Sequence, residues 1–274
     1  MFNIQYIRFY LVAILIWPYV FTNAYYYCNK QKKLCGTNKH FMCDLDSVPI
    51  KADVLGLLPL TGSMKRLYVD RHNEHRNRLA GGEQEFGNQG AGIFPKATRM
   101  REVIWDDELA YIAGIHAKRC NMEHDACHGT ERFPGSGQNL YTAKNSSKPK
   151  IGANFVLGAI DTWWNEYKDV DDGNALADEF PKGTTDWVKV GHFTAIANER
   201  TAFVGCGLAL CQNSTSKVYH IHVTCNYSNT NVLDTFMYKK GNYSTSNCDY
   251  YESAPSSKYA HLCTNTGKIF KDDK

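Results

Sequence analysis

Residues 191–227 restrict the possible folds of this chain more than any other stretch of its sequence. Three runs in this stretch alternate or nearly alternate between apolar and polar residues, and the turn-rich segment CQNSTSK separates two of them. The pattern predicts a β-hairpin with a preceding strand that begins at His192. Cys206 and Cys225 would then lie on neighbouring antiparallel strands, where their Cα atoms can come within the ~4.4–6.8 Å that a disulfide requires. We therefore expect a disulfide-linked sheet with a histidine at its edge.

The N-terminal segment, residues 1–24, has the features of a secretory signal peptide. It has one early cation, Arg8, then an apolar run, and the small residue Ala24 at the expected cleavage point. A membrane anchor is the alternative, but the run is shorter than the ~20 residues that span a bilayer, and Pro18 interrupts it. We therefore expect a secreted mature chain that begins near Tyr25 and has no membrane span.

The chain has ten cysteines, an even number that suits an oxidising compartment and suggests that all of them pair. They are Cys28, Cys35, Cys43, Cys120, Cys127, Cys206, Cys211, Cys225, Cys248 and Cys263. A structural zinc site is the competing interpretation, but no CxxC pair occurs among these cysteines. Their spacing does not by itself determine which cysteines pair.

The charge of the chain gives no electrostatic argument for a nucleic-acid or membrane partner. It carries 31 Lys and Arg against 28 Asp and Glu, a net charge of +3, and loss of Arg8 with the signal peptide would lower this charge by one.

N-glycosylation sequons begin at four positions, as suits a secreted chain: Asn145, Asn213, Asn226 and Asn242. Asn226 directly follows a cysteine of the predicted sheet and should be shielded. We therefore expect glycans at Asn145, Asn213 and Asn242.

Several motifs together resemble the CAP superfamily, which includes cysteine-rich secretory proteins, insect antigen-five venom allergens and plant pathogenesis-related proteins. They are GHFT, VGCG and HVTCNY in the second half of the chain, and HNEHR and WDDELAYIA in the first half. The chain departs from the usual pattern where Ala195, Ile196 and Ala197 replace a segment that contains a tryptophan, and where Thr230 replaces a glycine. The resemblance covers residues 65–231 and is strongest to insect antigen-five-related secreted proteins.

This resemblance implies an α/β fold, namely a three-layer α/β/α sandwich with a mixed, mainly antiparallel sheet. The helical periodicity agrees with such a fold. We expect one helix from an N-cap at Ser63 to Gly81, a second after an N-cap at Asp106, and a third over residues 152–167.

Roughly 250 mature residues fit one domain with extensions at both ends. We expect a cysteine-tied arm of loops over residues 25–62, the CAP domain over 63–231, and a cysteine-containing extension over 232–274.

The resemblance also implies how the cysteines pair. Three disulfides carry over from the antigen-five proteins, namely Cys28–Cys43, Cys35–Cys127 and Cys206–Cys225. In that family the cysteine at the position of Cys120 pairs with one upstream, but no cysteine lies between Cys43 and Cys120 here. Cys211 is an additional cysteine, so Cys120–Cys211 and Cys248–Cys263 are the pairs that remain.

Four side chains enter the central cleft of the family, and the matching positions here are His124, Gln138, Glu166 and His192. Gln138 lies in GQNL, where many members have GENL, so a residue that can hydrogen-bond but cannot ionise replaces a glutamate. The resemblance assigns the four residues to two loops, one helix and one strand.

Two neutral imidazoles, His124 and His192, together with the Glu166 carboxylate have the composition of a site for zinc or another divalent ion. Three interpretations stay open: weak binding of a metal ion or other ligand, a structural network of hydrogen bonds, and catalysis. The resemblance favours a monomeric, non-enzymatic extracellular binding protein that requires no cofactor. Its ligand would be a lipid, a small effector, a metal ion or a cell-surface protein, in a venom, saliva or reproductive-fluid type of role. A metal-dependent hydrolase is the alternative.

Two further histidine pairs resemble metal sites but are interpreted as structural. His72 and His75 are three positions apart on the first helix, rather than the four of HExxH. His220 and His222 alternate on a predicted strand and so share one face of it. We interpret that face as the polar face of the sheet.

Overall fold

The computed structural model describes residues 26–43, 45, 52–88, 90–180 and 186–271. The chain divides into two compact units, one of residues 1–49 and 125–134, and a larger one of residues 50–124 and 135–274. The predicted signal peptide lies outside the described residues.

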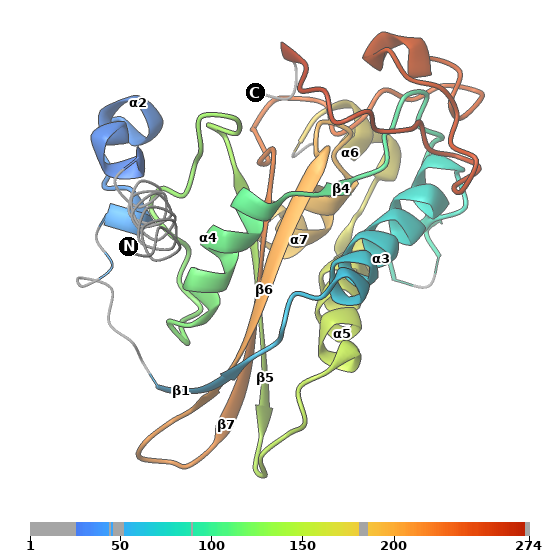
Figure 1. Cartoon of the computed structure of the whole chain (residues 1–274). Coiled ribbons are helices and arrows are strands. Elements are labelled where there is room, and N and C mark those ends of the chain that lie inside the picture. Colours follow the sequence, from blue (N-terminus) through green and yellow to red (C-terminus); the bar gives the residue numbers. More distant parts are fainter. Residues whose placement is uncertain (1–25, 44, 46–51, 89, 181–185, 272–274) are drawn as a thin grey trace, which may run out of the picture. The chain divides into compact units, whose positions relative to one another are not determined.

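A five-stranded sheet forms the centre of the larger unit (Figure 1). Its strands are β1 (Asp53–Leu57), β4 (Ile104–Trp105), β5 (Gly137–Asn145), β6 (Phe203–Gln212) and β7 (Tyr219–Tyr227). The order is β1-β6-β7-β5, and β4 lies beside β6. Only the pairing of β4 with β6 is parallel among these strands. The sheet is therefore mixed and mainly antiparallel, as predicted. A separate two-stranded sheet consists of β2 (Glu85–Phe86) and β3 (Gly92–Ile93).

Helices cover both faces of this sheet, which confirms the predicted α/β/α sandwich (Figure 1). On one face α4 (Asp107–Ala117) packs on β6 and β7. The other face carries α3 (Gly62–Ala80), α5 (Ala153–Trp164) and α7 (Trp187–Ala197). The shorter helices of the unit are the 3-10 helix η2 (Asn165–Asp169), α6 (Gly173–Asp178) and the 3-10 helix η3 (Cys248–Tyr251).

Two glycines of the VGCG segment allow α4 to lie directly on the sheet. A Cβ atom added at Gly205 would lie 2.1 Å from Ala110 N, and one at Gly207 would lie 2.5 Å from Gly114 Cα. These neighbours are backbone atoms, which cannot rotate away from a new Cβ atom as the end of a side chain could. A side chain at either glycine would therefore push the helix away from the sheet.

The opposite face of the sheet holds the main apolar core. Leu208, Ile221 and Val223 point into it and are at most 2% exposed. The disulfide between Cys206 and Cys225 lies in the same layer, and the strand register places the two cysteines directly opposite each other. Their Cα atoms are 4.0 Å apart, slightly closer than expected.

All five predicted disulfides are present: Cys28–Cys43, Cys35–Cys127, Cys120–Cys211, Cys206–Cys225 and Cys248–Cys263. No cysteine among the described residues is free. Cys120 forms its disulfide with the additional cysteine, Cys211, as predicted.

The predicted helices are present, with two changes at their ends. The Asp106 side chain caps α4 by accepting from Leu109 N, as expected. The cap of α3 is Thr61, whose hydroxyl accepts from Met64 N, so the prediction of Ser63 was wrong by two positions. The third helix ends early, and η2 continues it as a tighter turn that carries Glu166.

The expectation that His192 begins a strand was wrong, because GHFT lies within α7. Val190, Phe193 and Ile196 recur at helical spacing and are all fully buried. The Asp186 side chain caps this helix by accepting from Val188 N. Over so few residues the apolar pattern fits both the two-residue period of a strand and the 3.6-residue period of a helix. Packing against α5 and η2 favours the helix.

The N-terminal arm contributes a strand that its sequence did not indicate. β1 pairs with β6 in antiparallel fashion, with an irregular register between Val54 and Gly56. At the other end of the chain, the C-terminal extension packs on the rest of the larger unit. Isolated bridges join Lys240 to Ala97 and Cys263 to Arg101.

The smaller unit contains α2 (Gln31–Cys35) and the 3-10 helix η1 (Phe41–Cys43). Its two disulfides close the arm on itself and tie it to the loop that contains Cys127. The Glu131 carboxylate accepts from Lys30 Nζ at 2.7 Å and from the Tyr26 hydroxyl. These contacts, with that of Lys30 the largest, lower the pKa of Glu131 to about 2.

Candidate functional site

Glu166 and His192 form one pair of the predicted cleft residues. Glu166 Oε1 lies 2.5 Å from His192 Nδ1, while Oε2 accepts from the backbone N–H groups of His192 at 2.8 Å and Phe193 at 3.0 Å. The two side chains are 20% and 32% exposed, so they are reachable from solvent. The Trp163 ring stacks beside the imidazole with its centroid 6.2 Å away. Because Nδ1 faces the carboxylate, Nε2 is the nitrogen that can meet a ligand.

His124 and Gln138 form the other pair. His124 Nδ1 lies 3.0 Å from Gln138 Oε1, and Gln138 Nε2 donates to Asn226 Oδ1 at 3.2 Å. An amide oxygen only accepts, so Nδ1 is the donor and Nε2 of the neutral ring is left with a lone pair. Gln138 lies on β5 and not on a loop, which corrects the predicted origin of this residue.

The structure thus joins the four predicted residues as two pairs, and Asn139 connects them. Asn139 follows Gln138 on β5, and its Nδ2 donates to the backbone oxygen of His192 at 3.1 Å. Successive side chains of a strand point to opposite faces. The side chains of Gln138 and Asn139 therefore lie on opposite faces of β5. Asn139 was not singled out from the sequence, although it belongs to the same GQNL motif.

A buried chain of hydrogen bonds fixes the position of Asn139. Asn139 Nδ2 also donates to the Tyr227 hydroxyl at 3.2 Å, which lies 3.0 Å from His72 Nε2. His72 Nδ1 in turn lies 2.7 Å from the backbone oxygen of Tyr68. Burial lowers the pKa of His72 to about 4, so this ring is neutral at neutral pH. The residue acts as a structural group rather than as a metal ligand.

His75 also has protein partners. Its Nε2 lies 2.8 Å from Asp161 Oδ1, and its ring stacks on Trp164 at 4.7 Å between centroids. Arg71 donates to both oxygens of the same carboxylate at 2.6 and 2.8 Å. These contacts join α3 to α5 and occupy the ring nitrogen that a metal would need.

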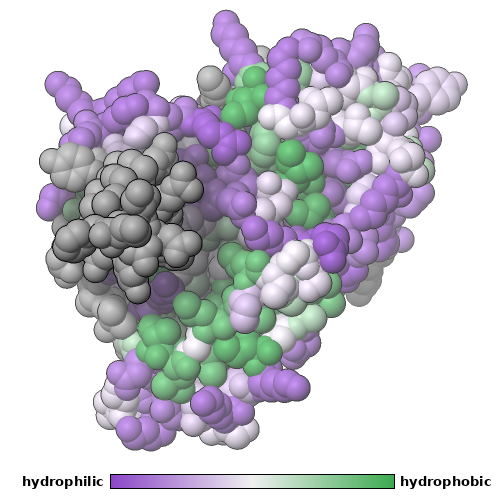
Figure 2. Space-filling model, viewed as in Figure 1, coloured by the Kyte–Doolittle hydropathy of each residue, from purple (hydrophilic) through white to green (hydrophobic). Residues whose placement is uncertain are grey.

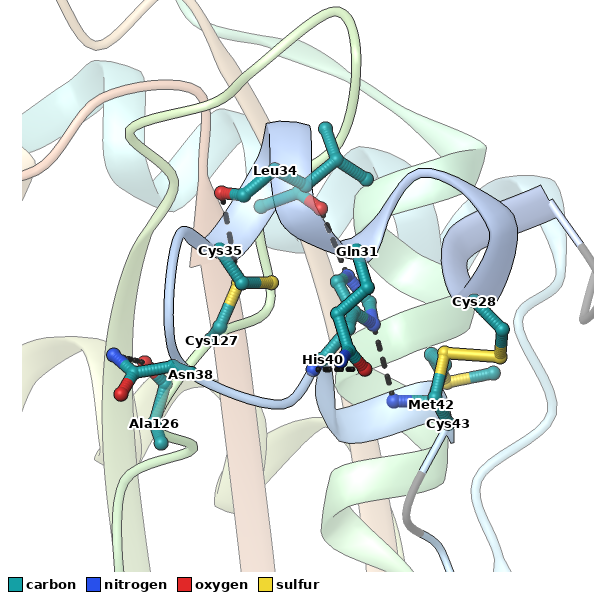
Figure 3. The surroundings of a disulfide bond; sticks show 11 residues. Cys28, Gln31, Leu34, Cys35, Asn38, His40, Met42, Cys43, Ala126 and Cys127 are labelled. Carbon is teal, nitrogen blue, oxygen red and sulfur yellow. Dashed lines mark hydrogen bonds between the residues drawn. A yellow bond between two sulfur atoms is a disulfide. The ribbon is translucent and has the colours of Figure 1, made fainter.

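Within the described part of the chain, three potential metal-ligating groups gather at one place, formed by Cys35, His40 and Cys127. The two sulfur atoms are joined in a disulfide and are therefore not thiolates. His40 Nδ1 accepts from Met42 N at 3.1 Å, as Figure 3 shows, and Nε2 lies 2.8 Å from Gly129 O. This cluster is accordingly a structural feature of the smaller unit.

Two hollows on the larger unit lie outside the predicted cleft residues. One of about 340 Å³ lies between η2 and α7 and is polar, with Asp171, Asp186 and Lys189 in its wall. The other, of about 190 Å³, is an apolar groove between β1 and α4 that Leu57 and Tyr111 line. Figure 2 shows this groove within a green patch over those two elements. It is smaller than the ~300–1,000 Å³ of typical small-molecule sites.

The α/β/α sandwich and the disulfides agree with the family that the comparison with known proteins identifies. The model of the cysteine-rich secretory protein family, CAP, matches residues 69–227, and the chain belongs to this family.

Among its relatives are antigen-five-like venom allergens. The chain is 30% identical over 267 residues to venom allergen-1 of Aedes albopictus, covering 94% of this chain and 95% of the relative. It is 35% identical over 222 residues to venom allergen 3 of Solenopsis invicta, covering 80% and 91%.

Solved structures agree with this assignment. The crystal structure of NaASP2 with Zn²⁺ matches with a TM-score of 0.58 and 25% identity, over 74% of this chain and 96% of that one. BmVAL-1 has the same fold, with a TM-score of 0.62 and 23% identity over 75% and 95%. Across the described residues, every helix falls short of the length or apolar character needed to span a bilayer.

Proposed function

We propose that this protein is a secreted, monomeric, non-enzymatic binding protein of the extracellular space, and that His124, Gln138, Glu166 and His192 form its ligand site. One observation carries the proposal. Each imidazole has its Nδ1 held by a side-chain oxygen, at 3.0 Å in one pair and 2.5 Å in the other. Each ring can therefore offer its Nε2 atom to a ligand, because its Nδ1 atom is already occupied.

The hydrogen bonds of Glu166 favour binding over hydrolysis. A metal-dependent hydrolase needs a carboxylate or imidazole that is free to take a proton from water. Both oxygens of Glu166 are already engaged, by His192 Nδ1 and by two backbone N–H groups, so neither is placed to take a proton from water. Gln138 cannot ionise at all. The hydrolase therefore remains the weaker alternative.

In this proposal a divalent ion is a weakly bound ligand of these donor groups. The two Nε2 atoms are the groups that would hold it, and Glu166 would orient His192 in the way that carboxylates orient metal-bound histidines. The similarity to a structure of NaASP2 with Zn²⁺ supports this choice of ion. Because Gln138 supplies no negative charge, we expect this binding to be weak and the ion not to be required.

The disulfides and the relatives support the proposal that the protein is secreted. Five disulfides are stable in an oxidising compartment and rare in a reducing one. The similarity to venom allergens supports a venom, saliva or reproductive-fluid type of role, in which the protein sequesters a lipid, a small effector or a metal ion, or engages a cell-surface protein.

Zinc calorimetry on the purified protein tests the ligand site. We compare the native protein with a His124→Ala, His192→Ala double variant, and use His261→Ala as a control that removes a histidine elsewhere. The double variant should lose one bound equivalent, and the control should lose none. Affinity should fall as the pH is lowered, because a protonated imidazole cannot bind a metal ion. Unchanged stoichiometry in the double variant would contradict the proposed site.

The same preparations test the alternative. Peptide and ester substrates should show no turnover that zinc stimulates and a chelator abolishes. Gln138→Glu should tighten zinc binding, because it adds a negative charge beside the ion. Chelator-sensitive turnover that disappears in the double variant would instead establish the hydrolase.

A further inference from the structure

His220 and His222 form a second histidine pair, on β7 and outside the predicted cleft. They occupy alternate positions, and their rings stack with centroids 6.0 Å apart and planes 16° apart. The register places them opposite Cys211 and Ala209 of β6, on the face that α4 covers. The prediction of an ordinary polar face was therefore incomplete, because His222 is only 5% exposed.

The surroundings of His222 contain hydrogen-bonding atoms without partners. In the described part of the chain, His222 Nδ1 is buried and has no hydrogen-bond partner, and the same holds for Thr142 Oγ1. Thr142 lies directly opposite His222 across β5 and β7. Directly opposite side chains on one face have Cβ atoms ~4.5–5.5 Å apart, so the two polar groups share one small space. Buried polar atoms without partners are costly, and their convergence is what a ligand site looks like before the ligand binds.

A third histidine, His116, lies near His222. His116 is not itself available, because its two ring nitrogens lie 2.9 Å from Thr224 Oγ1 and 3.0 Å from Glu123 O.

One cation lies close to the pair. Lys144 is opposite His220 in the register, but it is exposed and its long side chain can extend into solvent. Its charge should weaken, but not prevent, binding of a second cation.

We propose that His220 and His222 together bind one transition-metal ion through their ring nitrogens, and that the Thr142 hydroxyl hydrogen-bonds a water on that ion. Two imidazoles with no carboxylate suit Cu²⁺ and Zn²⁺, in that order of affinity, and do not suit Ca²⁺ or Mg²⁺. Binding requires the rings to turn until one nitrogen of each lies ~2.0–2.1 Å from the ion. Water would take the remaining positions.

This site is distinct from the cleft. His222 lies four positions along β7 from Asn226, which holds Gln138, and four strand residues span about 13 Å. The two sites can therefore be removed separately, and failure of one leaves the other intact.

The test uses the His124→Ala, His192→Ala variant, in which the cleft is disabled. Titration with Cu²⁺ and with Zn²⁺ should still give one bound equivalent, with Cu²⁺ the tighter, and Cu²⁺ should show nitrogen coupling in its electron paramagnetic resonance spectrum. Adding His220→Ala should weaken this binding by roughly tenfold or more, since one of two ligands is lost. His220 is only half-buried, so this variant should fold normally.

Two further variants separate the site from unspecific histidine binding. Thr142→Val keeps both imidazoles and should weaken binding less than His220→Ala does. His261→Ala, added to the same background, removes a histidine of the extension and should leave the affinity unchanged. Equal metal affinity with and without His220, or equal losses from His220→Ala and His261→Ala, would overturn the proposal.

Discussion

Replacing the buried His72 should make the protein more resistant to acid. The backbone oxygen of Tyr68 can only accept, so His72 Nδ1 carries the proton and Nε2 accepts from the Tyr227 hydroxyl. The neutral ring therefore satisfies both of its neighbours. Protonation would place a charge in a fully buried position and a second N–H against a hydroxyl that Asn139 already uses as an acceptor.

The size of the effect follows from the shift in pKa. Burial lowers the pKa of His72 from an ordinary value of ~6.5 to about 4. The unfolded chain then takes up the proton more readily than the folded one. The contribution of His72 to stability is therefore complete above about pH 6.5, and decreases by about 1.4 kcal/mol per pH unit until it is lost near pH 4. The total loss of stability between about pH 6.5 and pH 4 is about 3 kcal/mol.

The assay is urea unfolding of the native protein and of His72→Gln between about pH 7.5 and pH 4.5, with disulfides intact. At high pH the variant should be the less stable, by about 1–2 kcal/mol for its altered hydrogen bonds. From pH 6.5 to pH 5 its free energy of unfolding should fall by about 2 kcal/mol less than that of the native protein. Tyr227→Phe is the matched control. It should lower stability at every pH but keep the native slope, because its imidazole stays buried. Parallel curves for native and His72→Gln proteins would refute this account.

Two further predictions concern the core. Serine substitution of the Cys120–Cys211 disulfide should lower the free energy of unfolding by about 1 kcal/mol more than that of Cys206–Cys225, because the cysteines are 91 rather than 19 residues apart and the loop entropy released is larger. Thermal and urea unfolding measure the difference, and a larger loss from the shorter loop would contradict it. Gly205→Ala should destabilise by about 1–3 kcal/mol through its contact with Ala110 N, whereas Gly158→Ala on α5 meets no atom within 4 Å and should be neutral or stabilising by up to ~1 kcal/mol. Similar losses from both substitutions would show that α4 does not press on β6.

The cleft shows how much of the site the resemblance to the CAP superfamily predicted. It supplied the four residue positions and three of the disulfide pairs, and the two pairs that remained, Cys120–Cys211 and Cys248–Cys263, are also present in the structure. It did not supply the hydrogen bonds that join His124 to Gln138 and Glu166 to His192, nor the role of Asn139 between them. Those contacts depend on how β5, η2 and α7 pack together. These elements are distant in the sequence, so no local sequence pattern predicts their packing.

Sequence by itself determined the features that act over a few residues: the Asp106 cap, the hairpin of β6 and β7, and the alternation that places Cys206 and Cys225 opposite each other. Tertiary structure decided that GHFT is helical, because seven residues fit two periods equally and only burial of Val190, Phe193 and Ile196 against neighbouring elements distinguishes them. It also decided that His222 is buried. The sequence shows two alternating histidines, but α4 covers that face of β7 only because Gly205 and Gly207 of the next strand let it approach.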